Sequence, residues 1–160
     1  MHACIAADLA TEEGLAVAEV ARILERMDMG GAVAAADVVQ QLGALRRWLS
    51  ERWPEAQRLV EVPVTQVLPN GQQLVGRIDL LLRTEVGWIL VDHKASPQGS
   101  GRSEDLAEKH GGQLAAYAAA IEAITGQQVL ERWLVLPVAG VTSRDKSGGA
   151  SRAVPGGQIA

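Results

Sequence analysis

Two apolar runs carry charged side chains where the interior of a β-strand normally holds branched aliphatic residues. Residues 76–82 include Asp79, and residues 88–94 include Asp92 and Lys94. Because burying an unpaired carboxylate is costly, each acid requires a cation. Side chains alternate along a strand, so Asp92 and Lys94 point the same way. Two acids and an amine on neighbouring strands form either a buried salt bridge or a binding site for a divalent metal ion.

An Asp-x-Lys pattern alone is more often a salt bridge, because short patterns recur by chance. Here Gly76-Arg77-Ile78-Asp79 is followed by Val91-Asp92-His93-Lys94, and then by Gln113-x-x-x-Tyr117. This order and spacing resembles the PD-(D/E)xK nucleases, and within them the RecB-type exonuclease domain at the C-terminal end of helicase-nucleases. The resemblance extends back through residues 61–64 to His2 and covers about residues 1–140.

The resemblance implies a site for Mg²⁺ or Mn²⁺. Its implied ligands are His2, Asp79, Asp92 and the backbone carbonyl of His93, and oxygen ligands suit these ions. The ion would polarise the scissile phosphate and activate a water molecule. Lys94 would orient that water and stabilise the developing charge. His2 is equally consistent with a frayed terminal histidine, since chain ends are often mobile.

Four further side chains have open roles. Gln113 and Tyr117 lie on one face of a predicted helix, because residues four apart are neighbours there. The resemblance implies that they hold the DNA backbone or support the metal ligands, and the alternative is a polar face over solvent. Arg77 shares a strand face with Asp79 and either contacts phosphate or pairs with an acid. Glu61 stands where such domains often place an acid, although a solvent-facing carboxylate is the simpler interpretation.

Hydrophobic periodicity and turn residues predict the elements that bring the charged runs together. The predicted helices are 2–27, with Gly14 as a candidate break, 34–53 and 113–124. The predicted strands are 60–68, 73–83, 88–95 and 129–137. The order α-α-β-β-β-α-β gives an α/β fold with a mixed central sheet flanked by helices, and the resemblance implies that this is a PD-(D/E)xK core. Three strands form an antiparallel meander, and a helical crossover makes the fourth parallel to the third. Residues 96–111 are expected to form a polar loop, and 141–160 a flexible C-terminal tail beyond a nuclease domain of residues 1–140.

Composition narrows the class of protein. The 160 residues are 48% hydrophobic and 21% charged, which is typical of one globular domain. The single cysteine, Cys4, excludes a disulfide framework and an all-cysteine metal site within the chain. No run approaches the roughly 20 apolar residues that span a bilayer, so a cytoplasmic location without a membrane partner is expected.

The net charge of −4 disfavours a free-standing DNA binder, since non-specific binding depends on contacts from Lys and Arg to phosphate. A basic partner domain is therefore expected to supply most of the grip on DNA. There is no GxxxxGK[ST] loop, so the ATP-dependent helicase motor is expected outside this chain, in the same polypeptide or complex.

Three functions remain open at this point. The first is a Mg²⁺-dependent deoxyribonuclease, an exonuclease module of a helicase-nuclease in DNA double-strand break repair or recombination. By resemblance, its products carry 5′-phosphate and 3′-hydroxyl ends. The second is a non-catalytic DNA-holding scaffold with a nuclease fold, and the third is a structure-specific endonuclease with the same site chemistry. The set of Asp79, Asp92 and Lys94 favours the first function, whereas the acidic net charge leaves room for the second.

Overall fold

The computed structural model describes residues 1–67, 71, 73–93, 103–136 and 141–144, with the backbone alone for 103–110, 136 and 141–144. The chain divides into two compact units, Met1–Pro54 and a second that begins at Glu55, and each is described by itself. Over the described residues, no helix combines the length and the apolarity that a membrane crossing requires.

The N-terminal unit contains three helices: α1 (His2–Leu9), α2 (Val17–Arg26) and α3 (Ala35–Arg52). The sequence predicts one helix over 2–27, with Gly14 as a candidate break, and the chain does break there. Gly14 has a φ of +86°, in the left-handed region that glycine tolerates and that no α-helix contains. The helix predicted at 34–53 is confirmed as α3. Burial raises the pKa of the Cys4 thiol in α1, so this side chain behaves as a small apolar group.

A buried ion pair fastens α1 to α3. The Asp8 carboxylate, on a residue that is 2% exposed, accepts a hydrogen bond of 2.6 Å from Arg46 Nε and one of 2.8 Å from the backbone N–H of Leu15. Arg46 also donates to the carbonyl oxygen of Glu12 at 3.0 Å. One guanidinium therefore ties the end of α1 and the loop that follows it to the middle of α3.

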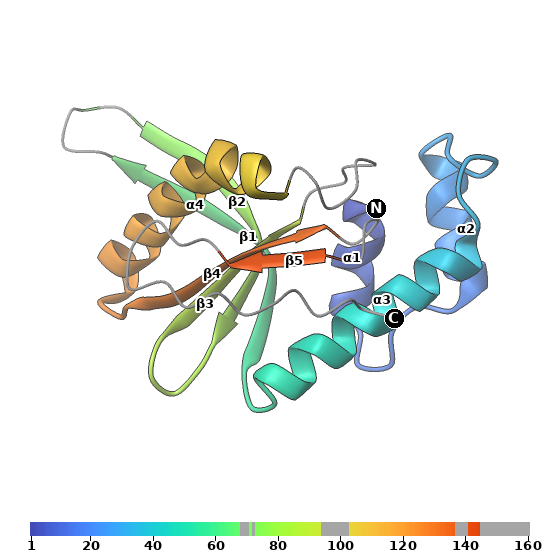
Figure 1. The fold of residues 1–160 in the computed structure, drawn as a ribbon, viewed down its shortest axis with the longest axis horizontal. Helices are drawn as coiled ribbons and strands as arrows, with labels where there is room; N and C mark the ends of the chain where they lie inside the picture. Colours follow the sequence, from blue (N-terminus) through green and yellow to red (C-terminus); the bar gives the residue numbers. More distant parts are fainter. Residues whose placement is uncertain (68–70, 72, 94–102, 137–140, 145–160) are drawn as a thin grey trace. The chain divides into compact units, whose positions relative to one another are not determined.

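The second unit is built on a five-stranded mixed sheet in the order β1-β2-β3-β4-β5 (Figure 1). Its strands are β1 (Gln57–Val67), β2 (Gln73–Arg83), β3 (Trp88–His93), β4 (Val129–Leu136) and β5 (Val141–Arg144). The first three strands form the predicted antiparallel meander, and β4 runs parallel to β3 as predicted. The α/β class and the mixed sheet are therefore confirmed.

The helix α4 (Ser103–Thr125) packs against one face of this sheet (Figure 1). Its buried side chains join residues of β1, β2 and β3 in one core cluster; the cluster comprises Val64, Ile78, Leu81, Trp88, Leu90, Leu114, Tyr117, Ala120 and Ile121. The helix ends at Thr125, and the φ of +69° at the following Gly126 suits a glycine after a helix. Because β3 and β4 are parallel, the chain needs a crossover of this kind between them.

Two boundaries differ from the sequence prediction. The loop predicted at 96–111 is wrong for 103–111, which belong to α4; a serine followed by two acids at 103–105 is typical of a helix start. The strand β5 lies where a flexible tail is predicted to begin, and it pairs antiparallel with β4. The sheet therefore extends past residue 140. The rest of the predicted tail, 145–160, and the rest of the predicted loop, 96–102, lie outside the described residues.

Candidate active site

Asp79 and Asp92 occupy opposed positions on neighbouring strands. The β2–β3 register pairs Leu80 with Val91, so the next position along each strand holds an aspartate. The backbone N–H of His93 donates to Asp79 Oδ2 at 2.7 Å, which fixes this carboxylate beside the end of β3. Asp79 is 9% exposed and Asp92 is 6% exposed. The structure thus brings the two predicted acids to adjacent places at one end of the β2–β3 pairing.

The His93 side chain is buried and lies near Asp79. Its Nδ1 is 3.6 Å from Asp79 Oδ2, a distance at which the two form an ion pair only when the imidazole is protonated. The backbone of His93 is already engaged with Asp79 through its N–H, so this residue supports the position of the acid. Its carbonyl oxygen as a metal ligand stays a prediction.

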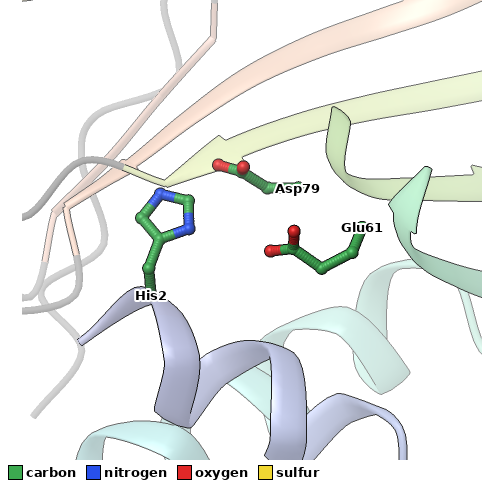
Figure 2. A group of neighbouring side chains, drawn as sticks. All are labelled: His2, Glu61 and Asp79. Atoms are coloured by element: carbon green, nitrogen blue, oxygen red, sulfur yellow. The ribbon is translucent and has the colours of Figure 1, made fainter. Parts of the chain in front are cut away.

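Glu61 is a third acid at this place, and the sequence interpretation of a solvent-facing carboxylate underrates it. The β1–β2 register pairs Val60 with Leu80 and Val62 with Ile78, which puts Glu61 opposite Asp79. A carboxylate oxygen of Glu61 lies within 4.8 Å of one from Asp79, and Figure 2 shows the two groups on neighbouring strands. Only the register between strands reveals this pairing, because eighteen positions of chain separate the acids.

The backbone at Glu61 departs from regular strand geometry. Its φ is +55°, and the pair Glu61/Asp79 is missing from an otherwise continuous ladder. On β1, both Leu59 and Val62 pack against the core cluster, so the alternation of side chains shifts by one residue across Glu61. A non-glycine residue in the left-handed region costs on the order of 1–3 kcal/mol, and such strain concentrates at functional sites.

Arg77 pairs with an acid, which was one of its two open roles. Its Nη1 lies 3.0 Å from Glu61 Oε2 and donates a hydrogen bond to it. The Arg77 side chain is 66% exposed and that of Glu61 is 33% exposed. Two carboxylates and one guanidinium therefore lie together on the β1–β2 hairpin.

Gln113 and Tyr117 are brought together on α4. The Gln113 side-chain amide donates to the Tyr117 hydroxyl at 3.0 Å, and Tyr117 is 6% exposed within the core cluster. The phenol covers Gly76 of β2: a Cβ there would lie 2.8 and 2.9 Å from two ring carbons, in addition to meeting the hydroxyl oxygen. Tyr117 is therefore buried, whereas Gln113 is exposed, and the role of the pair at the site stays a prediction. The Tyr117 ring packs against β2 three residues before Asp79.

Two predicted site residues are placed less directly. His2, drawn in Figure 2, is the first residue of α1 and belongs to the N-terminal unit. Lys94 lies outside the described residues, directly after His93 at the end of β3. Their roles as a metal ligand and as a catalytic amine stay predictions from the sequence.

The carboxylates of this region fit a divalent cation. Glu61 and Asp79 offer hard oxygen donors within 4.8 Å of each other, and Asp92 stands opposite Asp79 on the next strand. Carboxylate oxygens are the ligands that Mg²⁺ and Mn²⁺ prefer. Mutual repulsion between the acids falls when a cation sits between them.

The family model of the PD-(D/E)XK nuclease superfamily matches residues 1–147, and the chain belongs to this superfamily. Nucleases of this kind generally use divalent metal ions. The chain is also 32% identical over 127 residues to an ATP-dependent helicase/nuclease subunit from Desulforudis audaxviator; the match covers 75% of this chain and 10% of that protein.

Proteins with the same description show a similar relationship. The one from Pelotomaculum thermopropionicum is 38% identical over 87 residues, which is 54% of this chain and 6% of that protein. The one from Levilactobacillus brevis is 36% identical over 92 residues, which is 48% of this chain and 7% of that protein. The chain thus spans a tenth or less of the length of these relatives and corresponds to a nuclease domain within them.

Proposed function

We propose that this chain is the nuclease domain of a helicase-nuclease and cleaves DNA phosphodiester bonds with Mg²⁺ or Mn²⁺. The observation that carries the proposal is the pair of carboxylates of Glu61 and Asp79, whose oxygens lie within 4.8 Å of each other, with Asp92 next along β3 after the Leu80–Val91 pair. The finer assignment is an exonuclease acting in double-strand break repair or recombination. It draws on the relatives named helicase/nuclease and on the Gln113/Tyr117 pair that follows the site.

The site residues divide into ligands of the metal ion and one catalytic amine. Asp79, Asp92 and Glu61 hold the metal ion through carboxylate oxygens, with the His93 carbonyl as a further oxygen ligand. His2 is proposed as a ligand on the sequence argument alone. A divalent ion held by these residues would supply polarisation of the scissile phosphate and a lowered pKa for a water molecule. Lys94 orients that water and stabilises the charge that develops on the phosphate oxygens.

Gln113 and Tyr117 position the site from α4. Tyr117 packs on Gly76 and so sets the distance between β2 and α4. The Gln113 amide donates a hydrogen bond to the phenol and holds it in place. A shift of about 1 Å in a catalytic group can cost on the order of 100-fold in rate, so such support matters to the chemistry. The exposed Gln113 is also available to contact the DNA backbone.

Digestion of end-labelled linear DNA in Mg²⁺ tests the proposal. The wild-type chain should release labelled products, and Asp92→Ala and Lys94→Ala should abolish cleavage with unchanged circular dichroism. Glu85→Gln is a control, because it removes an exposed acid from the turn at the far end of β2. Retention of most cleavage by Lys94→Ala would contradict the catalytic assignment. A circular single-stranded substrate separates the two cutting modes, since an exonuclease leaves it intact and an endonuclease linearises it.

The second candidate function is a non-catalytic DNA-holding scaffold, which the net charge of −4 and the partial coverage of the relatives favour. Calorimetry with Mn²⁺ separates it from a nuclease. A nuclease should bind Mn²⁺ in a manner that Asp79→Ala abolishes and Glu85→Gln does not. Binding that is indifferent to Asp79→Ala, together with no cleavage, would favour the scaffold.

The proposed partners are DNA and an ATP-dependent helicase motor. The motor is proposed because the relatives are named as ATP-dependent helicase/nuclease subunits and because this chain matches only a tenth or less of them. Adding such a motor to the chain should raise cleavage of long linear DNA in an ATP-dependent manner.

A further inference from the structure

Arg77 and Glu61 form an ion pair that is well suited to exchange its partners. The contact that joins them is 3.0 Å from Nη1 to Oε2, and the guanidinium is 66% exposed. Exposed pairs of this kind contribute little free energy, because solvent screens both charges. A stronger cation at Glu61, or a stronger anion at Arg77, can therefore displace it.

Both competing partners are expected at this place if the proposed function is correct, and the inference rests on that function. Arg77 donates a hydrogen bond to Glu61 Oε2, which places its guanidinium beside the carboxylate of that acid. Asp79 in turn lies within 4.8 Å of Glu61. The guanidinium is thus attached to the same acid that would hold the metal ion next to the scissile phosphate.

We propose that Arg77 is a phosphate-binding residue whose availability depends on metal binding through Glu61. Without the ion, the guanidinium is held by Glu61 and offsets the repulsion between Glu61 and Asp79. When a divalent cation takes the negative charge of Glu61, the attraction between Glu61 and Arg77 weakens. The guanidinium is then available to a DNA phosphate, which it can engage with two parallel hydrogen bonds.

The test measures DNA and metal binding separately. Binding of a short single-stranded oligonucleotide to the full chain is followed by fluorescence anisotropy in Ca²⁺ and in EDTA. Binding of Mn²⁺ is followed by calorimetry without DNA. The variants are Arg77→Gln, Arg77→Lys and a matched control, Arg83→Gln, which removes the same charge from the far end of β2.

Arg77→Gln is expected to change the affinity for DNA without lowering the affinity for Mn²⁺. In Ca²⁺, Arg77→Gln should weaken DNA binding by about tenfold and reduce the slope of log K against log salt by about 1. In EDTA it should have little effect. Mn²⁺ affinity without DNA should be unchanged or higher, because a competing positive charge is gone. Arg77→Lys should keep the salt slope but bind less tightly than wild type, and Arg83→Gln should match wild type.

Two results would overturn the inference. A parallel loss of Mn²⁺ and DNA affinity in Arg77→Gln would mean that Arg77 only maintains the local structure. Unchanged DNA affinity and salt slope in Ca²⁺ would mean that it contacts no phosphate. Failure of the proposed function looks different, because then the wild-type chain itself would bind no Mn²⁺ through Asp79.

Discussion

Glu61 combines a strained backbone with a carboxylate close to that of Asp79. A φ of +55° lies outside the range of regular strands. No local interaction of a glutamate side chain favours this backbone conformation. The strain persists because the residues of β1 before and after Glu61 pair with β2 and fix its conformation. Strain held in this way is a free-energy cost to folding, and it motivates the metal-binding role proposed for Glu61.

Replacing Glu61 should therefore separate stability from metal binding. Asparagine tolerates the left-handed region and carries no charge, so Glu61→Asn should raise the free energy of unfolding by about 1 kcal/mol. The same change should weaken Mn²⁺ binding by about tenfold or more, because one carboxylate ligand is lost. Urea unfolding and calorimetry measure the two effects. Glu61→Gln keeps the strain and controls for charge, and a loss of stability in Glu61→Asn would refute the strain argument.

Position 76 requires a glycine because the Tyr117 ring, from a residue more than forty positions along the chain, packs directly against it. Adding a Cβ would push it into the ring of Tyr117, with no flexible chain end to move aside. Gly76→Ala should destabilise the protein by about 2 kcal/mol through overpacking. Tyr117→Ala in the same protein should recover part of that loss, which unfolding in urea would show. Gly43→Ala on α3 is the matched control, since its nearest neighbour is an Arg47 side-chain atom at 3.6 Å.

At the scale of elements, the Asp8–Arg46 pair decides whether α1 is held against α3. The sequence shows an acid and a base 38 positions apart and gives no sign that they meet. Their side chains are 3% and 17% exposed, so water does not compensate the carboxylate when its partner is removed. A short helix of eight residues has little stability of its own, so it depends on this contact.

Arg46→Met should cost about 3 kcal/mol of unfolding free energy, because it leaves a buried carboxylate uncompensated. Circular dichroism during urea unfolding measures the change. Arg47→Met removes an exposed arginine one position along the same helix and should cost little. Adding Asp8→Asn to Arg46→Met should return part of the loss, and strictly additive effects of the two changes would argue against a coupled pair.

The elements α4 and β5 show where local patterns are weakest. The predicted helix at 113–124 is the part of α4 with a clear apolar stripe. The first ten residues of α4, 103–112, are mostly polar and end in two glycines. The strand β5 has four residues and exists through pairing with β4. Short elements of this kind are stabilised by their neighbours, so their own sequence carries little signal.

At the scale of the whole molecule, the net charge of −4 opposes the proposed binding of DNA. Long-range repulsion between an acidic protein and the phosphate backbone has to be offset locally, by a bound cation and by arginines such as Arg77. The match covers 10% or less of the relatives' length, so the chain corresponds to a small part of them.

The isolated chain should therefore bind single-stranded DNA weakly, with a dissociation constant of about 10⁻⁴ M in physiological salt. Affinity should rise when the salt concentration is lowered, because fewer counterions compete for phosphate. Anisotropy of a labelled oligonucleotide in Ca²⁺ measures this. A submicromolar dissociation constant in physiological salt would show instead that the chain binds DNA tightly without a partner domain.

The sequence by itself determined most of the helices, the order of the first four strands and the positions of Asp79 and Asp92, but not the first part of α4 or the strand β5. These follow from the period of apolar residues and from turns, which are local properties of the chain. The tertiary structure decided that Glu61 stands opposite Asp79, that Arg77 pairs with Glu61, and that Tyr117 requires a glycine in β2. Each of these depends on the register between strands or on packing between a helix and a sheet. Both are set by contacts between residues far apart in the chain, which a single sequence does not encode as a local pattern.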